Sequence, residues 1–345
     1  ASTGTTDPEV YDLFLQGRAL HRQRGSRNLM DALDLFERAL VIDPNFAPAW
    51  AGLSHSLNVI TAYASVEEIE ALGDVDGRSL QAAEKALELD PTLATALHAM
   101  ANNQLARFNW AEAQDYYEQA LAQDPESTDI MEDYGHFLLY SWQTEKARLV
   151  ADQMIKLDPF VPIFRFMALR VYETLGENEA QDSHIAAALA IHPVLFSIQN
   201  RHLLRLVEEG DFAAAHSLVD QMDFQGWTTV ENMHRVIDWA SDPAKRPDDE
   251  MLTAIAYLPQ LALLAGEYEL WFEIVESKDE ERRWENILVT LSLLSSTAND
   301  QQFRALHADP RAKQMISEAS LPEYWRTVGW PPRCRPLGAE DFVCE

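Results

Sequence analysis

Glycine, basic residues and long apolar runs are scarce in this chain of 345 residues. Only 13 glycines are present, and because nucleotide-binding sheets, β-sandwiches and phosphate loops all use glycine, this scarcity favours helices. The 27 basic residues are outnumbered by 56 acidic ones, which gives a net charge of −29. A surface this acidic repels phosphate backbones and argues against direct binding of nucleic acid. No apolar run reaches the roughly 20 residues that span a bilayer.

Motifs of catalysis are also missing. No glycine-rich dinucleotide loop, P-loop, Gly-x-Ser-x-Gly or His-Glu-x-x-His pattern occurs. An enzyme would need a catalytic cluster in the less regular residues 228–345, and we find none there. The sequence therefore predicts a non-enzymatic protein that carries no cofactor and no metal.

Prolines preceded by Asp or His recur at a fixed interval. Pro91, Pro125, Pro159 and Pro193 are evenly spaced along the chain, and the interval from Pro44 to Pro91 is longer by an insertion of 13 near 60–77. Alanine stands five residues before most of these prolines, at Ala39, Ala86, Ala120 and Ala188. Small residues let two helices approach closely, and proline ends the second helix. The pattern predicts a repeating unit of two helices.

This unit resembles the tetratricopeptide repeat (TPR), a helix–turn–helix of about 34 residues. Trp50, Leu53, Gly135 and Tyr172 match positions of its first helix, and aromatic residues such as Phe36 stand eight residues before their prolines. The resemblance implies an all-α fold, a TPR α-α superhelix (solenoid). Its stacked units share one core because no unit buries its apolar face alone.

On this spacing we expect four segments along the chain. They are a disordered segment at 1–8, a TPR array of about six units at 9–227, degenerate helical repeats at 228–320 that form a C-terminal cap, and an irregular tail at 321–345 that packs on the C-terminal end. Terminal repeats are atypical because one of their faces must meet water.

The tail contains the two cysteines of the chain, Cys334 and Cys344. A single pair of thiols in a short irregular segment predicts a disulfide; two reduced cysteines or an incomplete metal site are the alternatives. A disulfide would place this region in an oxidising compartment.

Polar residues recur on the first helix of successive units, the face that lines the concave groove of such arrays. They are His55, Asn58, His98, Asn102, Glu132, His136, Arg170, Glu173 and Asn200. We expect this groove to bind a protein or peptide. A metal or small-ligand site is the alternative, as is pH sensing by the histidines. The cationic clamp of chaperone-binding members needs lysine, arginine and asparagine and is not matched, because its positions carry Glu132, His136 and Phe166 as well as Arg170 and Asn200.

The ends of the chain carry a narrower resemblance. The closing runs 321–326, 329–331 and 334–336 and the opening run 11–18 are similar to the C-terminal TPR domain of bacterial membrane-anchored winged-helix regulators of the ToxR/CadC type, or of cyclase-linked TPR proteins. The resemblance implies a sensory domain in signal transduction and transcription regulation, facing the periplasm and tied to the membrane only by an anchor outside these residues. The chain begins with Ala1, which indicates either a piece of a longer chain or a cloning remnant. A free-standing cytoplasmic scaffold, with reduced cysteines, is the alternative.

Overall fold

The structure, a computed structural model, describes residues 7–224, 227–277, 283–296, 299–339 and 341–345. Within these residues it contains 21 helices and one two-stranded hairpin, so the predicted all-α fold class is confirmed. The chain divides into two compact units, Ala1–Phe137 (unit 1) and Leu138–Glu345 (unit 2). This division falls within the array predicted at 9–227, whose boundaries stay a prediction. Among the described residues, no helix has both the length and the apolar character needed to cross a membrane.

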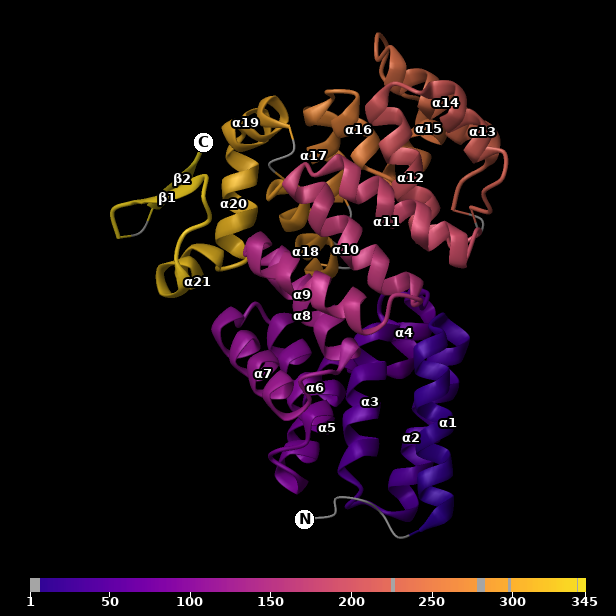
Figure 1. The fold of residues 1–345 in the computed structure, drawn as a ribbon, viewed down its shortest axis with the longest axis vertical. Helices are drawn as coiled ribbons and strands as arrows, with labels where there is room; N and C mark the ends of the chain where they lie inside the picture. Colours follow the sequence, from indigo (N-terminus) through magenta and orange to yellow (C-terminus); the bar gives the residue numbers. More distant parts are fainter. Residues whose placement is uncertain (1–6, 225–226, 278–282, 297–298, 340) are drawn as a thin grey trace. The chain divides into compact units, whose positions relative to one another are not determined.

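Unit 1 consists of helices joined by short turns, and α8 ends three residues beyond it. The helices are α1 (Pro8–Gln23), α2 (Ser26–Ile42), α3 (Ala47–Ile60), α4 (Val66–Leu72), α5 (Val75–Leu89), α6 (Ala94–Leu105), α7 (Trp110–Gln123) and α8 (Thr128–Tyr140). Helix α1 packs against α2, α3 against α5, and α6 against α7 (Figure 1). The insertion near 60–77 contains the short helix α4, whose start is held by a capping box between Ser65 and Glu68.

The predicted proline signals end the second helix of each pair. The residue before each proline is a helix cap whose backbone N–H donates to a carbonyl four residues earlier; these caps are Asp43, Asp90, Asp124, Asp158 and His192. Proline lacks an N–H and disfavours the helical conformation of the residue before it, so the helix cannot continue. The predicted repeating helix pair is confirmed.

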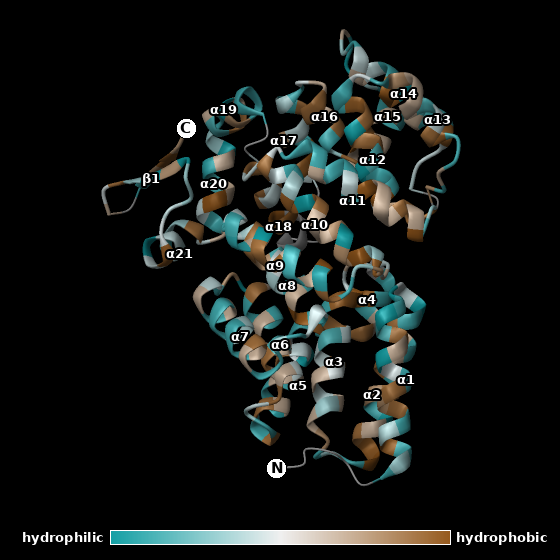
Figure 2. Cartoon of the chain, in the orientation of Figure 1, coloured by the Kyte–Doolittle hydropathy of each residue, from teal (hydrophilic) through white to brown (hydrophobic). Residues whose placement is uncertain are grey.

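Close packing of the pairs depends on small residues beside a buried ring. Phe36 of α2 is fully buried, and a Cβ atom added to Gly17 or Gly52 would lie 2.8 or 2.6 Å from its ring. Contacts this short require glycine unless the ring moves. The helices carry both hydrophobic and hydrophilic residues (Figure 2), and in α2 the apolar ones recur at the three- and four-residue spacing of a buried helical face.

Unit 2 continues with helix pairs that become shorter towards the C-terminus. Its helices are α9 (Thr144–Leu157), α10 (Pro162–Leu175), α11 (Asn178–Ile191), α12 (Phe196–Glu209), α13 (Phe212–Val219), α14 (Val230–Ser241), α15 (Asp249–Tyr257), α16 (Gln260–Leu264), α17 (Tyr268–Ser277), α18 (Arg283–Leu294), α19 (Asp300–Ala308), α20 (Pro310–Glu318) and α21 (Leu321–Val328). The strands are β1 (Cys334–Leu337) and β2 (Asp341–Cys344).

The two ends of the chain differ from the prediction. Of the segment 1–8 predicted to be disordered, residues 1–6 lie outside the described residues, whereas Asp7 caps α1 and Pro8 opens it. The tail 321–345 is not irregular, because it forms α21 and the antiparallel hairpin β1–β2. Pro322 stands in the first turn of α21, where its missing N–H costs nothing.

The tail folds back onto the middle of the chain. The buried Trp325 donates from Nε1 to the carbonyl of Ser141 at 3.0 Å, and its ring centroid lies 5.0 Å from that of Trp142. Trp142 in turn donates to the carbonyl of Leu291 at 2.9 Å. These contacts attach the tail to the turn after α8. Ion pairs of Arg333 with Asp300 and of Asp341 with Lys313 also hold the tail against α19 and α20, near the C-terminal end on which the sequence predicts it to pack. Cys334 and Cys344 are directly opposed in the hairpin and are bonded to each other in the structure.

Candidate functional site

A polar cavity of about 240 Å³ lies within unit 1. Its walls include side chains from α1, α3, α6 and α8, and the polar ones include Arg18, His21, His55, His98, Glu132 and Asp133. Each of these helices is the first of its pair, so the cavity lies on the face where the sequence predicted a groove. Successive repeats therefore contribute to one site.

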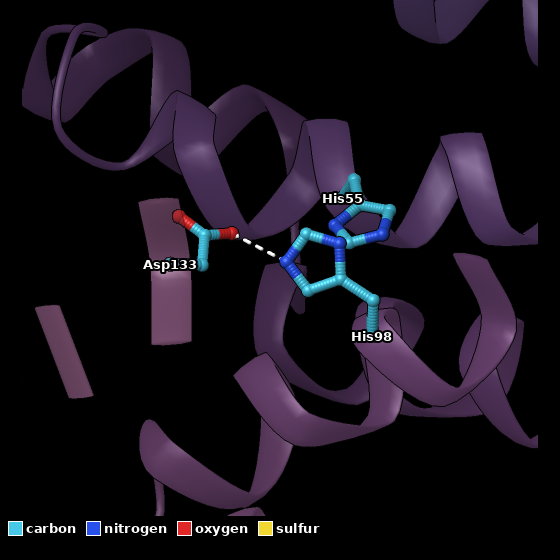
Figure 3. A group of neighbouring side chains, drawn as sticks. All are labelled: His55, His98 and Asp133. Atoms are coloured by element: carbon cyan, nitrogen blue, oxygen red, sulfur yellow. Dashed lines mark hydrogen bonds and ion pairs between the residues drawn. The ribbon is translucent and has the colours of Figure 1, made fainter. Parts of the chain in front are cut away.

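Asp133 is the centre of the hydrogen-bond network in this cavity. Its Oδ2 atom accepts from His98 Nε2 at 2.7 Å and from Asn102 Nδ2 at 2.9 Å. Tyr117 donates to the amide oxygen of Asn102 and fixes its orientation. Figure 3 shows Asp133 at the edge of the His98 ring and His55 against that ring, with 4.3 Å between the two imidazole centroids. The network joins α6 to α8.

The two histidines nearer α1 are held in the neutral form. His55 Nε2 lies 3.2 Å from the carbonyl of Thr95, and its Nδ1 faces the Asn102 amide at 3.5 Å, which fits a ring that donates from Nε2. His21 accepts from Arg24 at Nε2, at 2.8 Å, and donates to Ser56. Burial, with Arg24 adding to it, lowers the pKa of His21 to about 3. Burial, with the neighbouring His98 and His21, lowers the pKa of His55 well below its usual value.

Two adjacent carboxyl groups in the cavity differ in charge. Burial, followed by the charge of Asp133, raises the pKa of Glu132 to about 8, so this group is protonated at neutral pH. Burial alone would raise the pKa of Asp133, but the hydrogen bond and charge of His98, with the bond from Asn102, hold it well below the ordinary range. Asp133 is therefore the anion of the pair, and Glu132 is neutral beside it.

Among the residues that the structure describes, two groups of side chains meet the distance requirement for a metal. They are His55, His98 and Asp133, and Glu132, Asp133 and His136; within each group the ligand atoms lie within 4.8 Å of one another. Metal binding to the first group would break existing bonds, since both ring nitrogens of His55 face partners and His98 Nε2 bonds Asp133. We therefore interpret the cluster as a hydrogen-bonded wall and retain the prediction of no metal for testing.

The predicted groove residues are divided between the units. Unit 1 holds His55, Asn58, His98, Asn102, Glu132 and His136, whereas unit 2 holds Arg170, Glu173 and Asn200. Of those in unit 1, His55, His98 and Glu132 line the cavity, and Asn102 bonds its central carboxylate. Asn58 is a correction, because its amide oxygen accepts from Ser79 on α5 at 2.9 Å and belongs to a buried polar cluster between helices. Helix α5 is the second helix of this pair and packs directly against α3.

The three predicted residues of unit 2 take part in separate polar contacts. Arg170 donates to Ser292 Oγ at 2.6 Å. Glu173 accepts from Arg201 at 3.1 Å through both of its oxygens. Asn200 donates to the Tyr257 hydroxyl at 2.9 Å.

Sequence reasoning missed His21, Arg24 and Asp133. The signal for His21 was present, because it stands one repeat length before His55 and thus holds the same position in the preceding repeat. Asp133 follows Glu132 directly, and no pattern in the sequence distinguishes which of the two carboxylates meets His98. Arg24 lies at the end of α1 with a φ of 58°, a conformation that no sequence signal indicates for arginine.

Comparisons with known proteins agree with this architecture. The chain is similar to the structure of the human IFIT1 dimer with m7Gppp-AAAA, with a TM-score of 0.54 and 17% identity over 92% of this chain and 71% of that chain. It is also similar to yeast Tom70, with a TM-score of 0.48 and 17% identity over 92% and 69% of the chains. For TTC0263, a TPR protein of Thermus thermophilus, the TM-score is 0.47 and the identity 17%, over 57% and 99%. No family model and no curated protein matches the chain.

The chain has a TPR fold. This conclusion rests on its helix pairs, which end at prolines at a constant interval and pack on small residues. At an identity of 17%, the similarity to the human structure concerns the fold alone. It does not test the resemblance to membrane-anchored regulators, which stays a prediction.

Proposed function

We propose that the chain is a non-enzymatic interaction domain and that the cavity of unit 1 binds a protein or peptide. The observation that carries the proposal is the convergence of polar side chains from α1, α3, α6 and α8 around one cavity. Protein-binding repeats use such surfaces because each repeat contributes a few contacts and the stack sums them. Asp124, Asp129 and Asp133 contribute carboxylates to the wall of the cavity, and Arg18 and Arg22 of α1 contribute guanidinium groups.

The cavity suits a peptide better than a nucleic acid. The human structure named above contains m7Gppp-AAAA, but the present chain has a net charge of −29. Binding a phosphate backbone requires several Lys or Arg contacts that release counterions. An anionic surface of this size opposes such binding, so we do not extend that ligand to this protein.

The sensory role belongs to the same proposal. We place the domain in a bacterial signal-transducing transcription regulator, at the periplasmic face of the inner membrane. The pairing of Cys334 with Cys344 supports this setting, because disulfides persist in oxidising compartments. A free-standing cytoplasmic scaffold is the rival, and it requires the two cysteines to be reduced in the cell. In the proposed regulator, binding of a ligand in the cavity would signal by changing the orientation of a domain outside these residues.

Selection of peptides tests the binding proposal. A displayed random peptide library is selected on the purified chain, and the affinities of the recovered peptides are measured by calorimetry. The double substitution Arg18→Ala and Glu132→Ala is expected to weaken them roughly tenfold or more, since it removes polar groups from the cavity wall. Arg38→Ala is the control, because its ion pair with Asp34 is exposed on α2. Peptides whose affinity falls in the control and not in the cavity variant would refute the assignment.

A further inference from the structure

Two adjoining cavities in unit 2 are lined by a buried arginine for which the described residues provide no ion-pair partner. Their volumes are about 80 and 310 Å³, and they share Arg201, Gln260 and Leu293. Helices α10, α12, α16 and α18 supply most of their walls. Cavities at the small end of the range for ligand sites fit small molecules.

Arg170 is the buried cation that has no ion-pair partner among the described residues. Only 7% of its surface is exposed, and its guanidinium donates to the neutral hydroxyl of Ser292. The rings of Tyr140 and Phe166 have their centroids 5.7 and 6.0 Å from its Cζ atom. Among the residues that the structure describes, no carboxylate forms an ion pair with Arg170. A buried cation without a counter-charge is destabilising, so the site favours an anion beside it.

Arg201 strengthens the positive character of the same site. Its side chain is 11% exposed and pairs with Glu173 at 3.1 Å, and its Cζ atom lies 5.8 Å from the centroid of the same Phe166 ring. Burial lowers the pKa of Arg201, and the charge of Arg170 adds to this effect while Glu173 opposes it. The site therefore contains two buried guanidinium groups, and in the described part of the chain only that of Arg201 has a carboxylate partner.

The neighbouring charges of the wall are acidic, but they pair with a different arginine. Arg205 and Glu208 also line the smaller cavity, and they pair with each other at 3.0 Å. Arg205 has two further carboxylate partners, Asp182 and Glu209. Among the described residues, none of these three carboxylates forms an ion pair with Arg170.

Hydrogen-bond acceptors without partners lie in the walls of the larger cavity. Asn200 donates to Tyr257, but its Oδ1 atom is buried and bonds nothing within the described part of the chain. The Oε1 atom of Gln260, a residue 8% exposed, is buried and unpartnered in the same sense. Buried acceptors without partners destabilise the folded chain, so a ligand that donates hydrogen bonds to them is favoured.

We propose that these cavities bind a free α-amino acid with an apolar side chain. Its carboxylate pairs with Arg170 and Arg201, and its ammonium group donates to Asn200 and Gln260. The side chain contacts apolar residues of the larger cavity, among them Phe166, Leu258 and Val289. The ligand supplies the missing anion and the missing donor together, which neither a simple carboxylate nor a simple amine does. This inference is independent of peptide binding in unit 1.

Calorimetry on the full chain with L-leucine tests the proposal. L-Leucine is expected to bind and to raise the melting temperature. Two analogues are expected to have an affinity lower by roughly tenfold or more: 4-methylpentanoate, which lacks the amino group, and isopentylamine, which lacks the carboxylate. A panel of the standard L-amino acids at millimolar concentration extends the search to other apolar side chains. Absence of binding across the panel, or equal affinity for 4-methylpentanoate and leucine, overturns the proposal.

Substitutions separate a ligand-binding role from a structural one. Arg170→Met is expected to reduce leucine affinity roughly tenfold or more while leaving the melting temperature of the free chain unchanged or higher, because an unpaired buried cation is removed. Asn200→Ala is expected to weaken leucine more than 4-methylpentanoate. Arg304→Met is the matched control, since Arg304 is exposed and paired with Asp300. Unchanged affinity in Arg170→Met, with a lowered melting temperature, contradicts the assignment.

Discussion

The imidazole of His98 on α6 and the carboxylate of Asp133 on α8 meet at 2.7 Å between Nε2 and Oδ2. This bond joins the first helices of two successive repeats at the surface of the cavity. His98 is almost buried, with 7% of its side chain exposed, whereas Asp133 is 31% exposed. A charged hydrogen bond at the edge of a cavity both stabilises the stack and offers polar atoms to a ligand.

Removal of this carboxylate is expected to destabilise unit 1. Asp133→Ala leaves the donors of His98 and Asn102 without their acceptor, and the expected loss is about 1–3 kcal/mol of unfolding free energy. Urea denaturation measures it. Asp129→Ala is the control, because its partner Arg22 is exposed, and its loss should stay within about 0.5 kcal/mol. Equal losses in the two variants would contradict the assigned role of Asp133.

The pH dependence of stability should report Glu132. Its folded pKa of about 8 lies above the ordinary value of 4.5, so the folded chain retains a proton that the unfolded chain has released. The stability from this proton is complete below pH 4.5 and is lost as the pH rises towards 8. Glu132→Gln keeps a neutral group throughout. Because Glu132 is only half-buried, its stability relative to the parent chain should rise by about 1 kcal/mol between pH 5 and 8.

Denaturation at a series of pH values makes the measurement. Glu112→Gln, at an exposed position on α7, should show no such trend. A stability difference between Glu132→Gln and the parent that does not change with pH would show that the carboxyl is ionised in the folded chain.

The buried histidines should not titrate near neutrality. The pKa of His21 is about 3 and that of His55 is well below its usual value, so NMR shifts of both imidazoles should stay constant from about pH 5 to 8. Spectra of His21→Gln and His55→Gln assign the signals. A midpoint near 6.5 for either ring would restore the hypothesis of pH sensing by histidine.

Zinc should bind weakly at the histidine cluster. Because His55 and His98 already use their ring nitrogens, one equivalent of Zn²⁺ should leave the melting temperature of the chain nearly unchanged. Differential scanning calorimetry with and without a chelator checks this. Zinc binding that His55→Ala abolishes would establish a metal site and overturn the hydrogen-bonded interpretation.

The cysteine pair should be oxidised in protein prepared without reductant. Intact-mass spectrometry after alkylation is expected to find no labelled thiol at Cys334 or Cys344. Cys344→Ser should lower the stability of the hairpin by about 2–3 kcal/mol in the chain-entropy model. Two labelled thiols would favour the cytoplasmic scaffold over the periplasmic domain.

The helix pairs could be predicted because their signals are local. Proline ends a helix by its own covalent structure, and a fixed interval between prolines needs no knowledge of tertiary contacts. The direction of individual polar side chains could not be predicted in the same way. Asn58 accepts a hydrogen bond from Ser79 on α5, which packs against α3. A side-chain contact between two separate helices leaves no pattern in the sequence.

The candidate sites could likewise be predicted only where the signal in the sequence is local. Repeat spacing identifies which positions share a face, and it would have found His21 from His55. It does not indicate that, among the described residues, Arg170 has no carboxylate partner and the Oε1 atom of Gln260 has no hydrogen-bond donor. These facts depend on contacts between helices far apart in the chain, such as α10 and α18. The position of the tail could not be predicted either, because it depends on a hydrogen bond between Trp325 and Ser141, which are far apart in the chain.

Hydrogen exchange on the chain bound to a selected peptide tests the central claim most directly. If the cavity of unit 1 is the binding surface, the peptide should slow exchange in the first helices α1, α3, α6 and α8 and leave the second helices α2, α5 and α7 unchanged. Protection confined to α2, α5 and α7 would place the partner on the opposite face of the repeats and contradict the proposed function.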